Sequence, residues 1–361
     1  MHQIKRRTLL AQAGLGVSTA ALATAMPKRL LAADQVKAGF VYVGPIGDHG
    51  WTYRHDIGRL DVEKTYGDRV ATTFVENVAE GPDAERVIRQ LATSHDIIFT
   101  TSFGYMNPTI KVAKQFPNVK FEHATGYQTA DNVAVYNSRF HEGRAVIGTI
   151  AGHMSKSGVA GYIASFPIPE VVMGINAFQL AMQAVNPDAQ LKVIWVNSWY
   201  DPGKEADAAR ALIDQGADII TQHTDSPAPL QVAEERGVKG FGQASDMKAF
   251  APNAQLTSII DDWGPYYIER VGAVLDGTWA TQNVWKGLKE NYVGIADYHA
   301  DLPAEVVAAA EAVRTGIIDG THHPFTGPIS NQAGERMIPE GETAPDEMLL
   351  GMDWYVPGVS A

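Results

Sequence analysis

Short β-rich runs alternate with amphipathic stretches of about a dozen residues from residue 36 onward. Strands that alternate with helices in this way form parallel sheets covered by helices, so the pattern predicts an α/β fold. The expected strands include VKAGFVYVG, DIIFTTS, VKFEHATG, GVAGYIAS, LKVIWVNS, DIITQHT, VKGFGQAS, LTSII and NYVGIA.

Two of the intervening stretches have clear helical features. In GPDAERVIRQLATSH, Pro82 suits the first turn of a helix, where a missing N–H costs nothing. In PEVVMGINAFQLAMQAVNP, apolar residues recur at spacings of four, three and four and therefore share one helix face: Val171, Ile175, Phe178 and Met182.

The chain contains more strands than one sheet usually needs. A seam falls near NSRFHEGRAVIGTIAGHMSKSG, and a second series of strand–helix units begins at GVAGYIAS. Two α/β lobes that face each other form a cleft at the carboxyl ends of their strands, where open parallel sheets bind ligands. After Thr326 the sequence changes character, with a hairpin expected around Gly334 and a short helix before Trp354. We expect this tail to be an ordered appendage.

The amino-terminal segment resembles an export signal. KRRTLL places two arginines before the weakly apolar stretch AQAGLGVSTAALATA, and small residues near Ala25 or Ala33 suit cleavage. We expect residues 1–33 to be a twin-arginine signal that is removed in the periplasm. A disordered tail or a membrane anchor is the alternative, although the apolar stretch is short for a membrane span.

Composition narrows the possible partners. The 361 residues are 45% hydrophobic and 19% charged, which is ordinary for a globular protein with two cores. Loss of residues 1–33, which hold five cations and no acid, would move the formal net charge from −12 to −17. Such an acidic surface disfavours nucleic acid and anionic lipid. The absence of Cys excludes disulfides, thiol nucleophiles, Cys-ligated zinc and a lipid anchor on cysteine.

The residues that follow the expected strands are rich in aromatic and polar side chains. If these strand ends face a cleft, they form its lining, and aromatic rings from both lobes suggest a flat ligand held between them. Loops at ASFPIPE, VNSWYDP, QHTDSP and DDWGPYY add Glu170, Tyr200, Asp201, His223, Asp262 and Trp263. The ligand-binding candidates are Asp48, His49, Trp51, Thr52, Phe103, Tyr105, Phe166, Trp199, Asp225 and Asp246.

Each candidate also has a structural alternative. A Trp after a strand often packs between helix and sheet, and an Asp before a helix often caps it. His49, His55 and Asp56 could be imagined as a metal set, but their spacing matches no metal motif, and we expect no metal. Asp246 is the strongest polar candidate, because a carboxylate at a buried strand end needs a partner such as ligand hydroxyls.

The motifs of common enzymes are missing from the sequence. We find no G-x-G-x-x-G after a strand, no G-x-x-x-x-G-K-[ST], no G-x-S-x-G and no H-E-x-x-H. We therefore expect no catalytic residue, no cofactor and no enzymatic activity. An exported enzyme acting on nucleosides or sugars is the alternative.

Several segments in the same order resemble one family. GPIGDHGWT, NVAVYNSRFHEGRAVIGTIAG, SWYDPGKEADAARALIDQGADII, GQASDM and TSIIDDW span nearly the whole expected mature chain. Together they are similar to the BMP family of ABC-transporter substrate-binding proteins, the basic membrane lipoproteins, which includes purine nucleoside receptors.

The resemblance implies two Rossmann-like lobes of the type I periplasmic binding protein fold, with a multi-crossing hinge and a ligand cleft between them. In nucleoside-binding relatives two aromatic rings stack on a purine, and the matching positions here are Trp51 and Trp199. The family's ribose-binding Asp matches Asp246, and its first-loop Asp matches Asp48. The expected parts are residues 36–140 with 264–290 as one lobe, 141–263 with 291–328 as the other, and 329–361 as the appendage.

The chain also departs from the family pattern. The lipobox Cys is absent, and Asp261 and Asp262 stand where many nucleoside binders have a Lys, which puts the ribose contact in doubt. A nucleobase such as adenine is therefore nearly as plausible as a nucleoside. We expect a monomer that delivers a purine to an ABC permease in the inner membrane. A simple sugar or another small heterocycle as ligand, or a role as a sensor subunit, remains the alternative.

Overall fold

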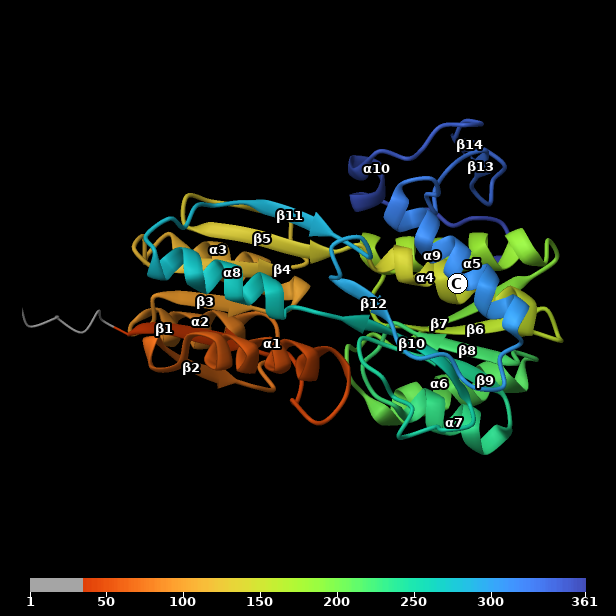
Figure 1. The fold of residues 1–361 in the computed structure, drawn as a ribbon, viewed down its shortest axis with the longest axis horizontal. Coiled ribbons are helices and arrows are strands. Elements are labelled where there is room, and N and C mark those ends of the chain that lie inside the picture. The colour runs from red at the N-terminus through yellow and green to blue at the C-terminus, as the bar shows by residue number, and fades with distance from the viewer. Residues whose placement is uncertain (1–34) are drawn as a thin grey trace, which may run out of the picture. The chain divides into compact units, whose positions relative to one another are not determined.

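The computed structural model describes residues 35–361, so the predicted export signal lies outside the described residues. The strands form two main sheets (Figure 1). The first sheet is entirely parallel, in the order β11-β5-β4-β3-β1-β2. Its strands are β1 (Val36–Val41), β2 (Val70–Val75), β3 (Ile97–Thr100), β4 (Lys120–Ala124), β5 (Val133–Ser138) and β11 (Asn283–Lys286).

The second sheet has the order β12-β10-β9-β8-β6-β7-β15, and within it only β12 runs antiparallel to its neighbour. Most of its strands are buried on both faces, which explains their near-continuous apolar runs. They are β6 (Val159–Ala164), β7 (Gln190–Trp195), β8 (Ile219–Gln222), β9 (Lys239–Gly242), β10 (Gln255–Asp261), β12 (Val293–Ile295) and β15 (Val359–Ser360).

Helices cover both sheets and define two lobes. The first lobe is the first sheet with α1 (Gly50–Tyr66), α2 (Pro82–Ala92), α3 (Met106–Ala113) and α8 (Gly264–Leu275). The second lobe is the second sheet with α4 (Phe140–Met154), α5 (Pro169–Val185), α6 (Pro202–Asp214), α7 (Ala228–Arg236) and α9 (Ala304–Asp319). The predicted apolar face of α5 is confirmed, since all four of its residues are buried. Pro82 and Pro169 each lie in the first turn of their helix.

The chain passes between the two lobes three times. The first crossing leads from β5 to α4, the second from β10 to α8, and the third from β11 to β12 (Figure 1). Each lobe is therefore built from separate parts of the sequence. The crossings bring the carboxyl ends of the strands in the two sheets to a common region.

The tail contains the expected hairpin and helix. Strands β13 (Ile329–Ser330) and β14 (Arg336–Ile338) pair antiparallel around Gly334, and α10 (Asp346–Leu350) precedes Trp354. Strand β15 then adds to the edge of β7, so the end of the chain extends the second sheet. Apolar tail side chains are buried in the same cluster as the second-lobe core: Phe325, Ile329, Ile338, Leu349, Met352, Val356 and Val359. Within residues 35–361 no helix combines the length and apolarity needed to cross a bilayer.

Candidate functional site: a cleft between the two lobes

A cavity of about 340 Å³ lies at the carboxyl ends of the strands of both sheets. This is the edge at which open parallel sheets bind ligands. The first lobe contributes Val43, Gly44, Pro45, Trp51, Asn77, Glu80, Ser102, Phe103 and Thr125. The second lobe contributes Phe166, Glu170, Asn197, Ser198, Trp199, Tyr200, His223, Thr224, Asp225 and Gln243.

Three of the lining residues have left-handed backbone conformations, which residues other than glycine rarely adopt. Asn77, Thr125 and Asn197 have φ angles of 56°, 62° and 50° and follow the ends of β2, β4 and β7. Such strained positions collect at functional sites, where the surrounding structure holds them in place. They turn each chain sharply from its strand into the loop that borders the cavity.

Trp51 is held firmly within the first lobe. It lies in the first turn of α1, and its indole N–H donates a hydrogen bond to the carbonyl oxygen of Thr101 at 2.7 Å. Its ring packs edge-on against Trp263 and His55, with ring centroids 5.3 and 4.4 Å away. The indole ring is therefore held by contacts within the first lobe.

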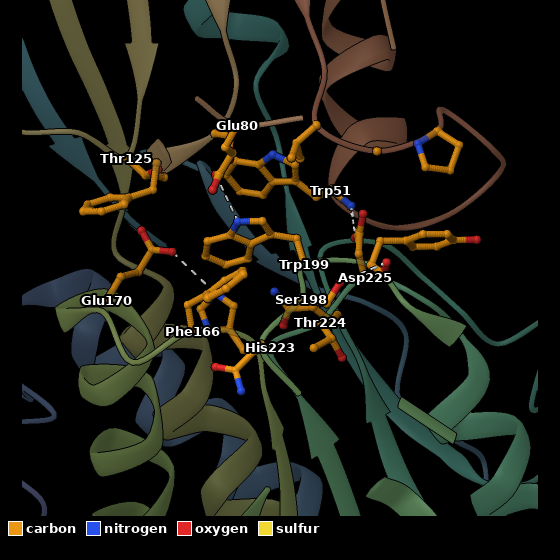
Figure 2. A pocket seen from close by; sticks show the side chains of 18 of the residues that line it. Trp51, Glu80, Thr125, Phe166, Glu170, Ser198, Trp199, His223, Thr224 and Asp225 are labelled. Carbon is orange, nitrogen blue, oxygen red and sulfur yellow. Dashed lines mark hydrogen bonds and ion pairs between the residues drawn. The ribbon is translucent and has the colours of Figure 1, made fainter. Parts of the chain in front are cut away.

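Trp199 reaches the cavity from the second lobe, in the loop between β7 and α6. Its indole N–H donates to Oε1 of Glu80 in the first lobe at 3.1 Å, and its ring centroid lies 5.1 Å from that of Phe166. The same carboxylate oxygen accepts hydrogen bonds from Ser102 Oγ at 2.6 Å and from the Gly104 N–H at 3.1 Å. Figure 2 shows this link across the cleft, with both indole rings at the cavity.

Part of the lining carries polar atoms that have no protein partner. His223 Nε2 lies 3.4 Å from Glu170 Oε1 (Figure 2), whereas Glu170 Oε2, His223 Nδ1 and Thr224 Oγ1 are buried without a hydrogen bond. Burial lowers the pKa of His223, which therefore stays neutral and offers one donor and one acceptor. Unpaired buried polar atoms are costly, so this edge of the cavity is prepared for a ligand with its own donors and acceptors.

The charges of the lining exclude some ligand classes. Glu80, Glu170 and Asp225 supply three carboxyl groups, and the lining formed by the described residues includes no Lys or Arg. Burial raises the pKa of Asp225 to about 7. A phosphate or carboxylate group in the cavity would meet acids and no cation, so the site favours a neutral or cationic ligand.

The cavity unites five of the ten sequence candidates: Trp51, Phe103, Phe166, Trp199 and Asp225. Asp246, the strongest polar candidate, lies elsewhere. It is exposed, and its Oδ1 accepts hydrogen bonds from the Lys248 N–H and from Gln255 Nε2 at 3.0 and 2.7 Å. The expectation of a buried carboxylate fails because β9 ends at Gly242 and the chain has reached the surface by residue 246.

The other four candidates also lie outside the cavity lining. Asp48 is exposed and pairs at 2.8 Å with His49, whose mostly buried ring lies 5.1 Å from the ring of Phe250 between centroids. Thr52 is buried in the first turn of α1. Tyr105 is fully buried, and its hydroxyl donates to the carbonyl oxygen of Val78 at 2.5 Å, so its role is structural.

His55 and Asp56, which the sequence offered together with His49 as possible metal ligands, contact different partners. His55 stacks on Trp263 at 4.7 Å between ring centroids and hydrogen-bonds to the Tyr267 hydroxyl. Asp56 pairs with Arg59 at 2.6 Å. Their side chains serve packing and ion pairing within the first lobe.

Sequence reasoning missed several lining residues: Asn77, Glu80, Ser102, Thr125, Asn197, Ser198 and Gln243. All of them follow strands, so the rule that strand ends face the cleft could have found them. Asn77 and Glu80 follow β2, an edge strand whose half-exposed residues form no continuous apolar run. The rest were overlooked because they are small or lack rings.

Comparison with known proteins shows the family to which the chain belongs. Residues 35–321 match the sequence model of the ABC transporter substrate-binding proteins described as PnrA-like. The chain belongs to this family. A purine-binding protein of Brucella abortus is 61% identical over 329 residues, covering 91% of this chain and 94% of the relative. A protein of Haloferax volcanii, provisionally named an ABC transporter glucose-binding protein, is 40% identical and covers 90% of this chain and 81% of its own length.

Solved structures of family-like proteins share the fold. Solute-binding proteins of ABC transporter systems from Conexibacter woesei and Aeropyrum pernix superpose with TM-scores of 0.63 and 0.68 at 22% and 20% identity. They cover 80% and 79% of this chain and 98% and 92% of their own chains. This substrate-binding protein therefore has the predicted α/β architecture of the type I periplasmic binding proteins. Membership implies a small-molecule ligand and an ABC permease as partner.

Proposed function

We propose that this protein captures a purine nucleobase, such as adenine, in the periplasm and delivers it to the permease of an ABC importer. The observation that carries the proposal is the placement of Trp51 and Trp199, from opposite lobes, on one cavity that lacks Lys and Arg among its described lining residues. The name of the Brucella abortus relative, at 61% identity, supports a purine.

Stacking alone does not supply the expected affinity. One aromatic ring on a base contributes ~1–3 kcal/mol, so two rings give a few kcal/mol, whereas micromolar binding needs about 8 kcal/mol. Desolvated hydrogen bonds must supply the rest. Glu170 accepts from an N–H, the Thr224 hydroxyl can donate to a ring nitrogen, and Nδ1 of the neutral His223, whose Nε2–H faces Glu170, can accept from a second N–H. The edge of adenine presents such alternating donors and acceptors.

The positions of the polar residues that were expected to hold a ribose favour a nucleobase over a nucleoside as ligand. Asp246 and Asp48, the positions that the family resemblance assigned to polar ligand contacts, lie outside the cavity lining. Among the polar side chains of the lining, Glu170, His223 and Thr224 carry buried atoms without a protein partner. A purine placed between the indoles can meet this edge without a sugar.

The proposed cycle involves binding and release without chemical change. The protein acts as a monomer without cofactor or metal, closes on the ligand, and presents the closed shape to the permease in the inner membrane. Export by the twin-arginine route would place it in the periplasm without a lipid anchor. Incubation of purified protein with adenosine or inosine, followed by chromatography, tests for the enzymatic alternative by looking for products.

Isothermal titration calorimetry of the mature chain tests the ligand class. We expect adenine to bind at micromolar concentration or tighter, adenosine more weakly, and AMP not at all. Glucose is included because the Haloferax volcanii relative is named for it. Binding of glucose without any response to adenine, guanine, hypoxanthine or inosine would overturn the purine proposal.

A further inference from the structure

The amino-terminal end of α1 has no cap from its own lobe. Its N-cap residue, His49, makes no side-chain hydrogen bond to the helix, and its ring instead pairs with Asp48. The first N–H groups of a helix have no intrahelical acceptors and need partners, particularly where they are buried. This matters here because Trp51 lies in that first turn.

The second lobe supplies the missing acceptors. Ser245 Oγ, in the loop after β9, accepts a hydrogen bond from the Gly50 N–H at 2.7 Å. The Asp225 carboxylate, in the loop after β8, accepts a hydrogen bond from the Trp51 N–H, and the neighbouring Thr52 N–H lowers the pKa of this carboxyl group. Figure 2 shows the Asp225–Trp51 bond across the cleft. A helix of one lobe is thus capped by two side chains of the other.

The close approach of the two lobes depends on Gly50. This residue has a φ angle of +79°, and a Cβ atom added to it would lie 2.2 Å from Asp225 Oδ1. Only glycine meets both the backbone conformation and the space. The local structure at this point is therefore shaped for the carboxylate of the opposite lobe.

Asp225 is also connected to the second indole. Its backbone N–H donates to the carbonyl oxygen of Trp199 at 3.0 Å, while its carboxylate holds the backbone of Trp51. We propose that Asp225 and Ser245 are positioning residues, which cap α1 across the cleft and thereby set both the closure of the lobes and the placement of Trp51 opposite Trp199. The proposal rests on the proposed role of this cleft, but its main test needs no ligand.

The environment of the carboxylate explains how closure would depend on pH. The groups that face Asp225 are Glu205 of α6, Tyr200 of the preceding loop and Asp261 of β10, together with the amino end of α1. Burial raises the pKa of Asp225 to about 7 in the closed arrangement, against 3.8 for an exposed Asp. Where opening exposes Asp225 to water, the closed form binds this proton more tightly, so closure is favoured as pH falls through about 7 and is independent of pH well above that value.

The distance between the lobes tests the proposal directly. The chain has no natural Cys, so Asp83→Cys on α2 and Asp207→Cys on α6, both exposed, can be spin-labelled cleanly. In the absence of ligand we expect Asp225→Ala to shift the distance distribution toward open forms relative to the parent protein. Asp225→Asn should shift it less, because the amide oxygen still accepts from an N–H.

Asp201→Ala is the matched control. Asp201 caps α6 within the second lobe by accepting from the Lys204 N–H at 3.1 Å, so its loss should leave the lobe distance unchanged. If Asp225→Ala fails to fold, Ser245→Ala, which removes only one hydroxyl, serves in its place. Unchanged distances in Asp225→Ala, or in Ser245→Ala if it is used, would overturn the proposal.

Ligand binding gives a second readout. Loss of a helix cap corresponds to about tenfold weaker adenine binding in Asp225→Ala. The affinity of the parent protein should rise as pH falls from 7.5 to 6, and that of Asp225→Asn should not. If Asp225→Asn shows the same gain in adenine affinity at lower pH, the group that titrates is not Asp225, and the proposed pH dependence of closure is wrong. If adenine binds neither the parent protein nor any variant, the proposed function is wrong. The distances between the lobes, measured without ligand, still test whether Asp225 and Ser245 set the closure.

Discussion

The two indoles differ in what holds them. The indole N–H of Trp51 bonds to Thr101 of its own lobe, whereas that of Trp199 bonds to Glu80 of the opposite lobe, so Trp51 is linked across the cleft only by its backbone bond to Asp225. Phe166 is the ring beside Trp199 within its own lobe. In the proposed function, Trp51 is therefore the platform of the first lobe, and Trp199 is the ring that the second lobe brings to it.

Substitution of Trp199 separates stacking from the cross-cleft bond. Trp199→Ala should weaken adenine binding about tenfold or more, since a stacked base loses ~1–3 kcal/mol. Trp199→Phe should retain most of the stacking and lose only the bond to Glu80. Titration calorimetry measures both. Trp354→Ala, in the tail outside the cavity lining, is the control, and equal losses in Trp354→Ala and Trp199→Ala would contradict the assignment.

The candidate site was only partly predictable from the sequence. Strand–helix alternation identified the loops, and rings such as Trp199 marked them, but sequence does not show which way a loop side chain points. Asp246 satisfies its carboxylate with Gln255 at the surface, a pairing that depends on the path of the chain after β9. The cap of α1 by Asp225 joins residues 174 positions apart and leaves no local pattern.

At the level of elements, the tail contacts the segments that cross between the lobes. Arg139 lies at the first crossing and forms two hydrogen bonds, of 3.0 and 2.6 Å, with the carboxylate of Asp346 at the start of α10. Its guanidinium carbon lies 4.1 Å from the ring centroid of Trp285 in β11, just before the third crossing. The tail thus stabilises the arrangement of two crossings.

Neutralising this ion pair should favour opening. Asp346 is 55% exposed at its side chain, so the pair contributes at most about 1 kcal/mol. We therefore expect Asp346→Asn to weaken adenine binding by no more than about fivefold. Asp214→Asn removes a similarly exposed pair with Arg236 inside the second lobe and should leave binding unchanged. Identical affinities for both variants and the parent protein would contradict a role of the pair in closure.

At the level of the whole molecule, the two-sheet architecture followed from the alternation of strands and helices, but the role of the tail did not. The family model ends at residue 321, yet the chain beyond it buries apolar side chains in the core of the second lobe and adds β15 to the sheet. Its short elements, such as the two-residue β15, carry too little pattern to predict this.

Neighbouring leucines of α10 test whether the tail shares the core stability. Leu349 is fully buried, whereas Leu350 is 45% exposed. Leu349→Ala should lower the free energy of unfolding by ~2–5 kcal/mol, because it removes a buried side chain and leaves a cavity. Leu350→Ala should change it by less than about 0.5 kcal/mol. Chemical denaturation measures both, and equal stability of the two variants would show that the tail unfolds separately.

The three crossings also determine when folding can finish. The first sheet needs β11, which is made long after β5, and the second sheet receives its last strand at residues 359–360. The first sheet can therefore complete its hydrogen-bonded ladder only after β11 has been made, and the second sheet only after residues 359–360 have been made. Until then β5 and β7 each keep one unpaired edge, and unpaired strand edges are sites at which chains can associate.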